Sequence, residues 1–98
     1  MTQVSSNEAQ ELREEMVIVN TLGMHARPAA ALVQSVLGFD SDVYIDLNSQ
    51  HVNAKSIMGL LTLAAGQGSR ITVTCTGSDA QEAMEAVRQL VESGFGED

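Results

Sequence analysis

Segments of two different hydrophobic periods alternate along this 98-residue chain, and their order limits the folds that the chain can adopt. Short β-branched or alternating segments are typical of strands, whereas apolar residues that recur every three or four positions are typical of amphipathic helices. The predicted strands are residues 16–20, 43–47, 51–54 and 70–76. The predicted helices are residues 26–37, residues 57–63, and a last helix that begins near a capping-box pattern at 78–81 and ends before Gly94. The order of elements is therefore βαββαβα.

The strands indicate an α+β fold. In segment 43–47, for example, apolar residues alternate with Tyr44 and Asp46. Strands with one apolar face are expected where helices cover only one side of a sheet. The sequence thus predicts an open-faced sandwich. Because only 3% of the residues are aromatic, the core must be aliphatic, and Cys75 is expected there as a buried structural thiol.

The chain is long enough for one hydrophobic core and too short for two. We expect residues 1–14 to be a polar, acidic N-terminal extension, residues 15–93 to form the domain, and residues 94–98 to be a short acidic tail in which Glu97 and Asp98 are solvated. A formal net charge of -8 argues against binding to nucleic acid or to anionic lipid. We expect a cytoplasmic protein, because the sequence has neither a membrane-spanning apolar run nor a signal-peptide core.

Residues 23–28 are the segment best suited to hold an anion. His25 ends a loop, and the helix predicted to follow it begins with backbone N–H groups that lack intrahelical partners. A neutral imidazole is nucleophilic near pH 7, and Arg27 can offer planar donors to phosphoryl oxygens. We therefore predict a phosphate site made by His25, Ala26 and Arg27. Either His25 or Arg27 could be the helix N-cap, which would make Pro28 the third or the first helical residue.

That pattern alone also fits an exposed loop histidine beside an ordinary helix. Ser56 precedes the predicted helix 57–63, where its hydroxyl can serve as the N-cap. So short a helix cannot bury all its apolar residues on one face, so some of them must be exposed and could form a partner surface. His51 has no second ligand at metal-binding spacing, which favours a surface role, and no metal site is predicted.

Two motifs carry a specific resemblance. They are Gly23-Met24-His25-Ala26-Arg27-Pro28-Ala29 and, further along, Val52-Asn53-Ala54-Lys55-Ser56-Ile57-Met58-Gly59. Together they closely resemble the HPr family, the histidine phosphocarriers of the bacterial phosphotransferase system, and the resemblance covers residues 15–93. It implies a four-stranded antiparallel sheet with three helices on one face.

The resemblance also implies a function. His25 would accept a phosphoryl group on Nδ1 from phosphorylated enzyme I and donate it to enzyme II A domains, with Arg27 assisting at the phosphate. Such a protein is a carrier without a cofactor rather than an independent enzyme, and we expect a monomer. Ser56 would be a regulatory phosphorylation site for an HPr kinase/phosphorylase. Ile57, Met58 and Leu61 would form the docking patch, which leaves Leu60 and Leu63 to the core.

Two pathway branches remain open. The motif around Ser56 is similar to the sugar-uptake and catabolite-control branch, which we favour, whereas the ending at residues 93–98 is similar to phosphocarriers of the nitrogen-related branch. A function of another class is a regulatory module that docks on a transcription factor or an enzyme without phosphotransfer. The presence of His25 argues against that module. A third reading, a small domain that binds nucleic acid or a metabolite, is disfavoured by the charge and the scarcity of aromatic residues.

Overall fold

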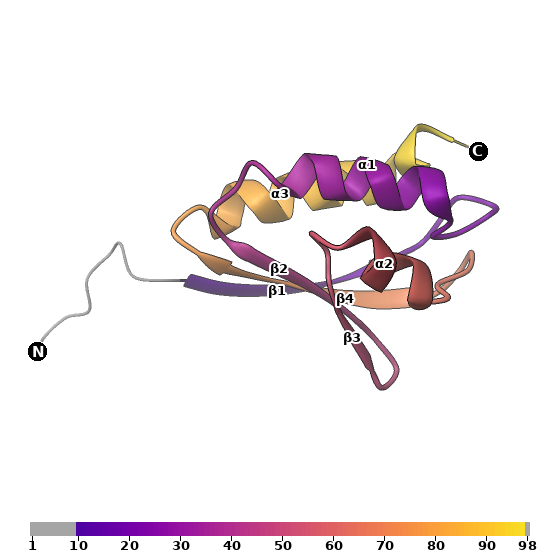
Figure 1. Ribbon diagram of the computed structural model, residues 1–98, viewed down its shortest axis with the longest axis horizontal. Coiled ribbons are helices and arrows are strands. Elements are labelled where there is room, and N and C mark those ends of the chain that lie inside the picture. Colours follow the sequence, from indigo (N-terminus) through magenta and orange to yellow (C-terminus); the bar gives the residue numbers. More distant parts are fainter. Residues whose placement is uncertain (1–9, 98) are drawn as a thin grey trace, which may run out of the picture.

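The computed structural model describes residues 10–97, and within them the element order is βαββαβα, as predicted (Figure 1). The strands are β1 (Gln10–Val17), β2 (Asp42–Leu47), β3 (Gln50–Asn53) and β4 (Arg70–Gly77). The helices are α1 (Ala26–Val36), α2 (Ile57–Thr62) and α3 (Ala80–Glu92), and a 3-10 turn, η1 (Gly94–Gly96), follows α3. None of the helices in the described residues is long and apolar enough to cross a membrane.

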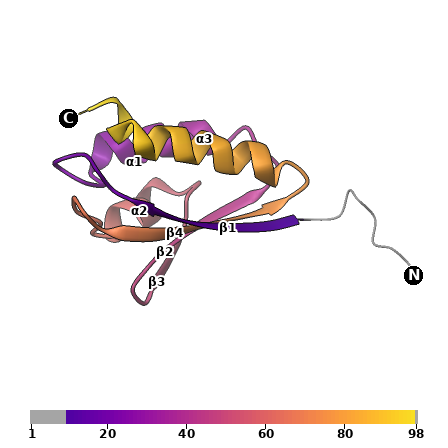
Figure 2. The same ribbon diagram turned by 180° about the vertical axis from the view of Figure 1, so that it is seen from behind.

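The four strands form one sheet in the order β1-β4-β2-β3, and every neighbouring pair is antiparallel. The helices lie on one side of this sheet in both views (Figures 1 and 2). The open-faced α+β sandwich is therefore confirmed. The two edges of the sheet are β1 and β3, while β4 lies inside and is paired on both sides.

The core between the sheet and the helices is aliphatic, as the scarcity of aromatic residues predicted. Its largest fully buried side chains come from both layers: Ile18, Leu32, Ile45, Leu60, Leu63, Ile71 and Val87. Cys75 is also fully buried, and this burial raises the pKa of its thiol to about 11. The thiol is therefore protonated at neutral pH and packs as a small apolar side chain.

The first strand begins earlier than predicted. Residues 10–14 belong to β1 and not to an N-terminal extension, while residues 1–9 of that predicted extension lie outside the described part of the chain. An edge strand exposes one face to water, so charged residues such as Glu11 and Arg13 fit there without an obvious strand pattern. The inward positions are Leu12, Glu14 and Met16, and the charged one, Glu14, forms an ion pair with Arg88 of α3.

Candidate functional site

The predicted phosphate site lies at the start of α1. His25 is the N-cap residue, with extended backbone angles, so Pro28 is the third helical residue. The carbonyl of His25 accepts a hydrogen bond from the N–H of Ala29 at 3.0 Å. Within residues 10–97, the N–H groups of Ala26 and Arg27 have no hydrogen-bond partner, and Pro28 has no N–H to satisfy. Two backbone donors are therefore available to an anion at this helix end.

Gly23 fixes the loop that leads to this helix. Its φ of 68° lies in the left-handed region, and a Cβ at this position would lie 2.3 Å from the carbonyl oxygen of Ala65. The same Ala65 oxygen accepts a hydrogen bond from the N–H of Met24 at 2.8 Å. The loop before His25 is thus held against the segment that precedes β4, and only glycine fits where the two backbones meet.

The imidazole of His25 is reachable from solvent and is held on one side by a carboxylate. Its side chain is 36% exposed. Nε2 lies 3.0 Å and 3.1 Å from the two carboxylate oxygens of Glu97, whereas Nδ1 has no hydrogen-bond partner among residues 10–97. The hydrogen bond with His25, followed by one from Asn20, holds the pKa of Glu97 below its usual range. Glu97 is therefore ionised at neutral pH.

Asn20 connects this carboxylate to the loop. Its side chain is fully buried, and its Nδ2 donates to the carbonyl of Gly23 at 2.8 Å and to Oε1 of Glu97 at 3.1 Å. In the described residues, Oδ1 of Asn20 is the only buried side-chain oxygen or nitrogen without a partner. The two hydrogen bonds from Nδ2 thus fix the orientation of this amide and connect Glu97 to the loop before His25.

The prediction that Glu97 is solvated was wrong, because its side chain is only 17% exposed, while Asp98 lies outside the described residues. Phe95 is only 7% exposed, and Glu97 contacts His25 across 72 positions of the sequence. In both views the C-terminal segment lies at the same end of the molecule as the loop that leads into α1 (Figures 1 and 2). A lone phenylalanine between two glycines, in a chain so poor in aromatic residues, was the one signal that this segment is anchored.

Arg27 is the second predicted site residue. It is the second helical residue of α1 and is exposed, and its guanidinium forms no hydrogen bond or ion pair with residues 10–97. Its charge is one of the smaller influences that lower the pKa of Glu97. An uncommitted guanidinium two residues beyond the imidazole can offer several donors to one anion.

The predicted N-cap role of Ser56 agrees with the geometry at α2. Its Oγ accepts a hydrogen bond from the N–H of Gly59 at 3.1 Å. The predicted docking residues on this helix are exposed: Ile57 by 41%, Met58 by 72% and Leu61 by 40%. Leu60 and Leu63 are buried, and α2 packs against α1, the helix that His25 caps.

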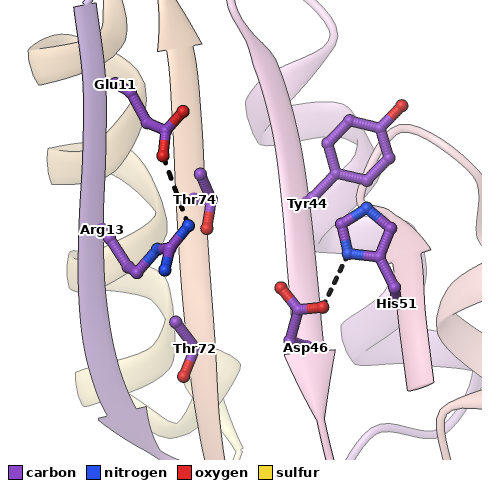
Figure 3. A pocket seen from close by; sticks show the side chains of 7 residues that line it. All are labelled: Glu11, Arg13, Tyr44, Asp46, His51, Thr72 and Thr74. Atoms are coloured by element: carbon purple, nitrogen blue, oxygen red, sulfur yellow. Dashed lines mark hydrogen bonds and ion pairs between the residues drawn. The ribbon is translucent and has the colours of Figure 1, made fainter. Parts of the chain in front are cut away.

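The uncovered face of the sheet carries a separate open groove, which does not include His25 (Figure 3). Two of its walls come from paired side chains, Glu11 with Arg13 on β1 and Asp46 with His51 on β2 and β3. Nδ1 of His51 lies 2.6 Å from Asp46, and its ring stacks on Tyr44 with centroids 4.6 Å apart. His51 is therefore a surface residue that forms a cross-strand hydrogen bond with Asp46. No cluster of three or more potential metal ligands occurs in residues 10–97.

Comparisons with known proteins agree on one family. The family model described as "PTS HPr component phosphorylation site" matches residues 12–93. The phosphocarrier protein HPr of Xylella fastidiosa (strain 9a5c) is 45% identical over 87 residues, which cover 89% of this chain and 98% of that protein. The HPr-like protein Crh of Halalkalibacterium halodurans is 51% identical over 70 residues, or 71% of this chain and 83% of Crh. The crystal structure of HPr-C-His from Thermoanaerobacter tengcongensis superposes with a TM-score of 0.85 at 40% identity, covering 89% of this chain and 98% of that one.

Proposed function

The chain belongs to the HPr family of phosphotransferase-system phosphocarriers, and we propose that it takes a phosphoryl group onto His25 from phosphorylated enzyme I and passes it to enzyme II A domains. The observation that carries this proposal is the partly exposed imidazole at the N-cap of α1. Among residues 10–97, its Nδ1 has no hydrogen-bond partner, and the N–H groups of the next two residues are unpaired. The same helix end thus carries a nucleophilic nitrogen and hydrogen-bond donors for the phosphoryl group that this nitrogen would accept.

The chemistry needs only positioning. Nδ1 attacks the phosphorus atom, while the N–H groups of Ala26 and Arg27 and the guanidinium of Arg27 offer donors to the phosphoryl oxygens. The helix dipole contributes roughly 0.3–2 kcal/mol in favour of the bound dianion. The protein acts as a carrier in this scheme, because it is loaded and unloaded in the active sites of its partners.

We assign docking on both partners to the exposed apolar side chains of Ile57, Met58 and Leu61. An apolar patch on a helix that packs against α1 can be covered by a partner whose active site reaches His25. Burying these three side chains in the complex would supply affinity without a tight fit at the phosphoryl group, which must leave again.

We also propose that Ser56 is a regulatory phosphorylation site, with an HPr kinase/phosphorylase as its modifying enzyme. Phosphoserine adds a charge of about -1.5 to -2, which is tolerated at a helix start but lies next to the apolar docking patch. The fold should therefore survive while docking weakens. A Ser56→Asp protein that accepts phosphate from enzyme I as fast as the wild type would contradict this role.

Of the two pathway branches, we favour the sugar type. The support is the motif around Ser56, which is similar to that of the sugar-uptake branch. The ending at residues 93–98 supports the nitrogen-related branch instead. The two are separated by offering the protein purified enzyme I of each branch and comparing kcat/KM for phosphorylation.

A second candidate function is a regulatory module that binds a transcription factor or enzyme without passing phosphate, for which the supporting observation is 40% identity to Crh, described as the Bacillus subtilis catabolite repression HPr. The deciding experiment is incubation with phosphoenolpyruvate and enzyme I, followed by intact-mass measurement. We expect one added phosphoryl group that is acid-labile and absent from His25→Ala. A folded wild-type protein that gains no phosphate from active enzyme I of either branch would overturn the carrier and favour the module.

A further inference from the structure

Residues 94–97 form a turn that brings Glu97 back toward His25. Gly94, Phe95 and Gly96 all have positive φ, at 66°, 58° and 75°. For a phenylalanine this conformation is strained, and burial of the ring holds it in place. The N–H of Glu97 donates to the carbonyl of Gly94 at 2.9 Å, which closes the turn. The position of Glu97 is thus set by an anchored turn.

Asn20 holds the Glu97 carboxylate next to the loop that carries His25. One buried Nδ2 group binds both Oε1 of Glu97 and the carbonyl of Gly23, two residues before His25. A Cβ at Gly94 would lie 3.7 Å from the Cβ of Asn20, so the C-terminal turn packs directly on this residue. The carboxylate is therefore held against the loop by contacts other than its bond to the histidine.

This arrangement decides which ring nitrogen carries the proton. An ionised carboxylate only accepts hydrogen bonds, and both of its oxygens lie within 3.1 Å of Nε2. Nε2 must therefore donate, and in a neutral imidazole the lone pair is then on Nδ1. The same contact covers Nε2, so only Nδ1 is open to an electrophile.

We propose that Glu97 is a positioning residue, which keeps the proton on Nε2 of His25, stops the ring from turning over, and so presents Nδ1 as the nucleophile. This inference rests on the proposed function and adds a residue to it. In the transfer, the Nδ1 lone pair forms the new N–P bond. The bond from phosphorus to the donor atom of enzyme I breaks, and its electron pair returns to that atom. The Nε2 proton stays in place, so the ring gains positive charge opposite the Glu97 carboxylate.

The first test uses the unphosphorylated protein with 15N-labelled histidine. In the wild type we expect the Nε2 proton to be visible by NMR and to exchange slowly with water. Glu97→Ala should speed that exchange at least tenfold, whereas Glu92→Ala, which removes the same charge from an exposed site on α3, should not change it. Equal exchange in the wild type and Glu97→Ala would overturn the proposal. Because no phosphoryl donor is present, this result is independent of whether the protein is a carrier.

The second test uses phosphoramidate, a small donor that imposes no orientation on the ring. The wild type and Glu92→Ala should carry phosphate on Nδ1 of His25 alone, as read by 15N and 31P NMR. Glu97→Ala should yield Nε2-phosphorylated product as well. The same single product in all three proteins would overturn the proposal, while failure of enzyme I to phosphorylate the wild type would instead overturn the proposed function.

Discussion

Arg88 of α3 donates two hydrogen bonds to Glu14 of β1, from Nε to Oε2 at 2.8 Å and from Nη2 to Oε1 at 2.6 Å. The paired geometry of the guanidinium matches the carboxylate and joins the edge strand to the helix layer across 74 positions of the sequence. This hydrogen bonding is the main cause that lowers the pKa of Glu14, and it raises the pKa of Arg88.

Arg88→Met should therefore lower the thermal midpoint at neutral pH. The sign of the pH dependence follows from the lowered pKa of Glu14: the stabilisation is present above the ordinary carboxyl pKa and is lost as pH falls through the lowered one. The gap between wild type and variant should thus close on acidification, as measured by thermal unfolding. Arg70→Met is the control, because Arg70 and Glu15 form an ion pair at 3.6 Å in which both side chains are well exposed. An equal effect of both variants would contradict the conclusion that the Arg88–Glu14 pair stabilises the fold.

Gly23→Ala should destabilise the fold by roughly 2 kcal/mol or more, because it adds both a left-handed alanine and a clash with the Ala65 carbonyl. Denaturant unfolding measures this loss. Gly66→Ala is the matched control: Gly66 has no positive φ and its added Cβ would meet nothing within 4 Å, so the change should stay within about 0.5 kcal/mol. Equal stability of the two variants would show that the loop does not depend on glycine at position 23.

Ser56→Ala should cost about 1 kcal/mol of unfolding free energy, because the N–H of Gly59 loses its capping partner. Ser56→Asp should retain most of that stability, since aspartate is also a favoured N-cap residue. Denaturant titrations of both variants check this. If Ser56→Asp proved as unstable as Ser56→Ala, a loss of phosphotransfer in the aspartate variant could no longer be ascribed to its charge at the docking patch.

Met58→Asp should raise the KM for phosphorylation by enzyme I at least tenfold while leaving the unfolding free energy within about 0.5 kcal/mol, because the Met58 side chain is 72% exposed. Leu37→Asp serves as the control, since Leu37 is 58% exposed but follows the opposite end of α1 from His25. A comparable rise in KM from Leu37→Asp would show that added negative charge, rather than the patch on α2, weakens docking.

Much of the fold could be predicted, because the periods of segments such as 43–47 and 80–91 report which side of each element is buried. The first six residues of β1 were not predicted as strand, because an edge strand tolerates charge on its open face and Glu14 is satisfied by a partner far along the chain. The capping box at 78–81 was wrong in detail for a similar reason. Asp79 is the N-cap of α3, and its carboxylate accepts hydrogen bonds from the backbone of Asp40 and Ser41 instead of capping the helix.

The site was predictable in part. His25 and Ser56 could be placed as helix N-cap candidates from local sequence, since capping depends on neighbouring residues. The contribution of Asn20 and Glu97 depends on a tertiary approach of residues 77 positions apart, which no local pattern reports. The backbone angles of the C-terminal turn are what bring them together.

The central claim is that His25 accepts a phosphoryl group and passes it on. The most direct measurement of this claim is the release of that group to an acceptor. The protein is phosphorylated with enzyme I, freed of enzyme and phosphoenolpyruvate, and mixed with a purified enzyme II A domain, and both proteins are weighed by intact-mass spectrometry over time. We predict that the phosphoryl group leaves this protein and appears on the acceptor in equal amount. Phosphate that remains on His25, while a known phosphocarrier unloads to the same domain, would contradict the account.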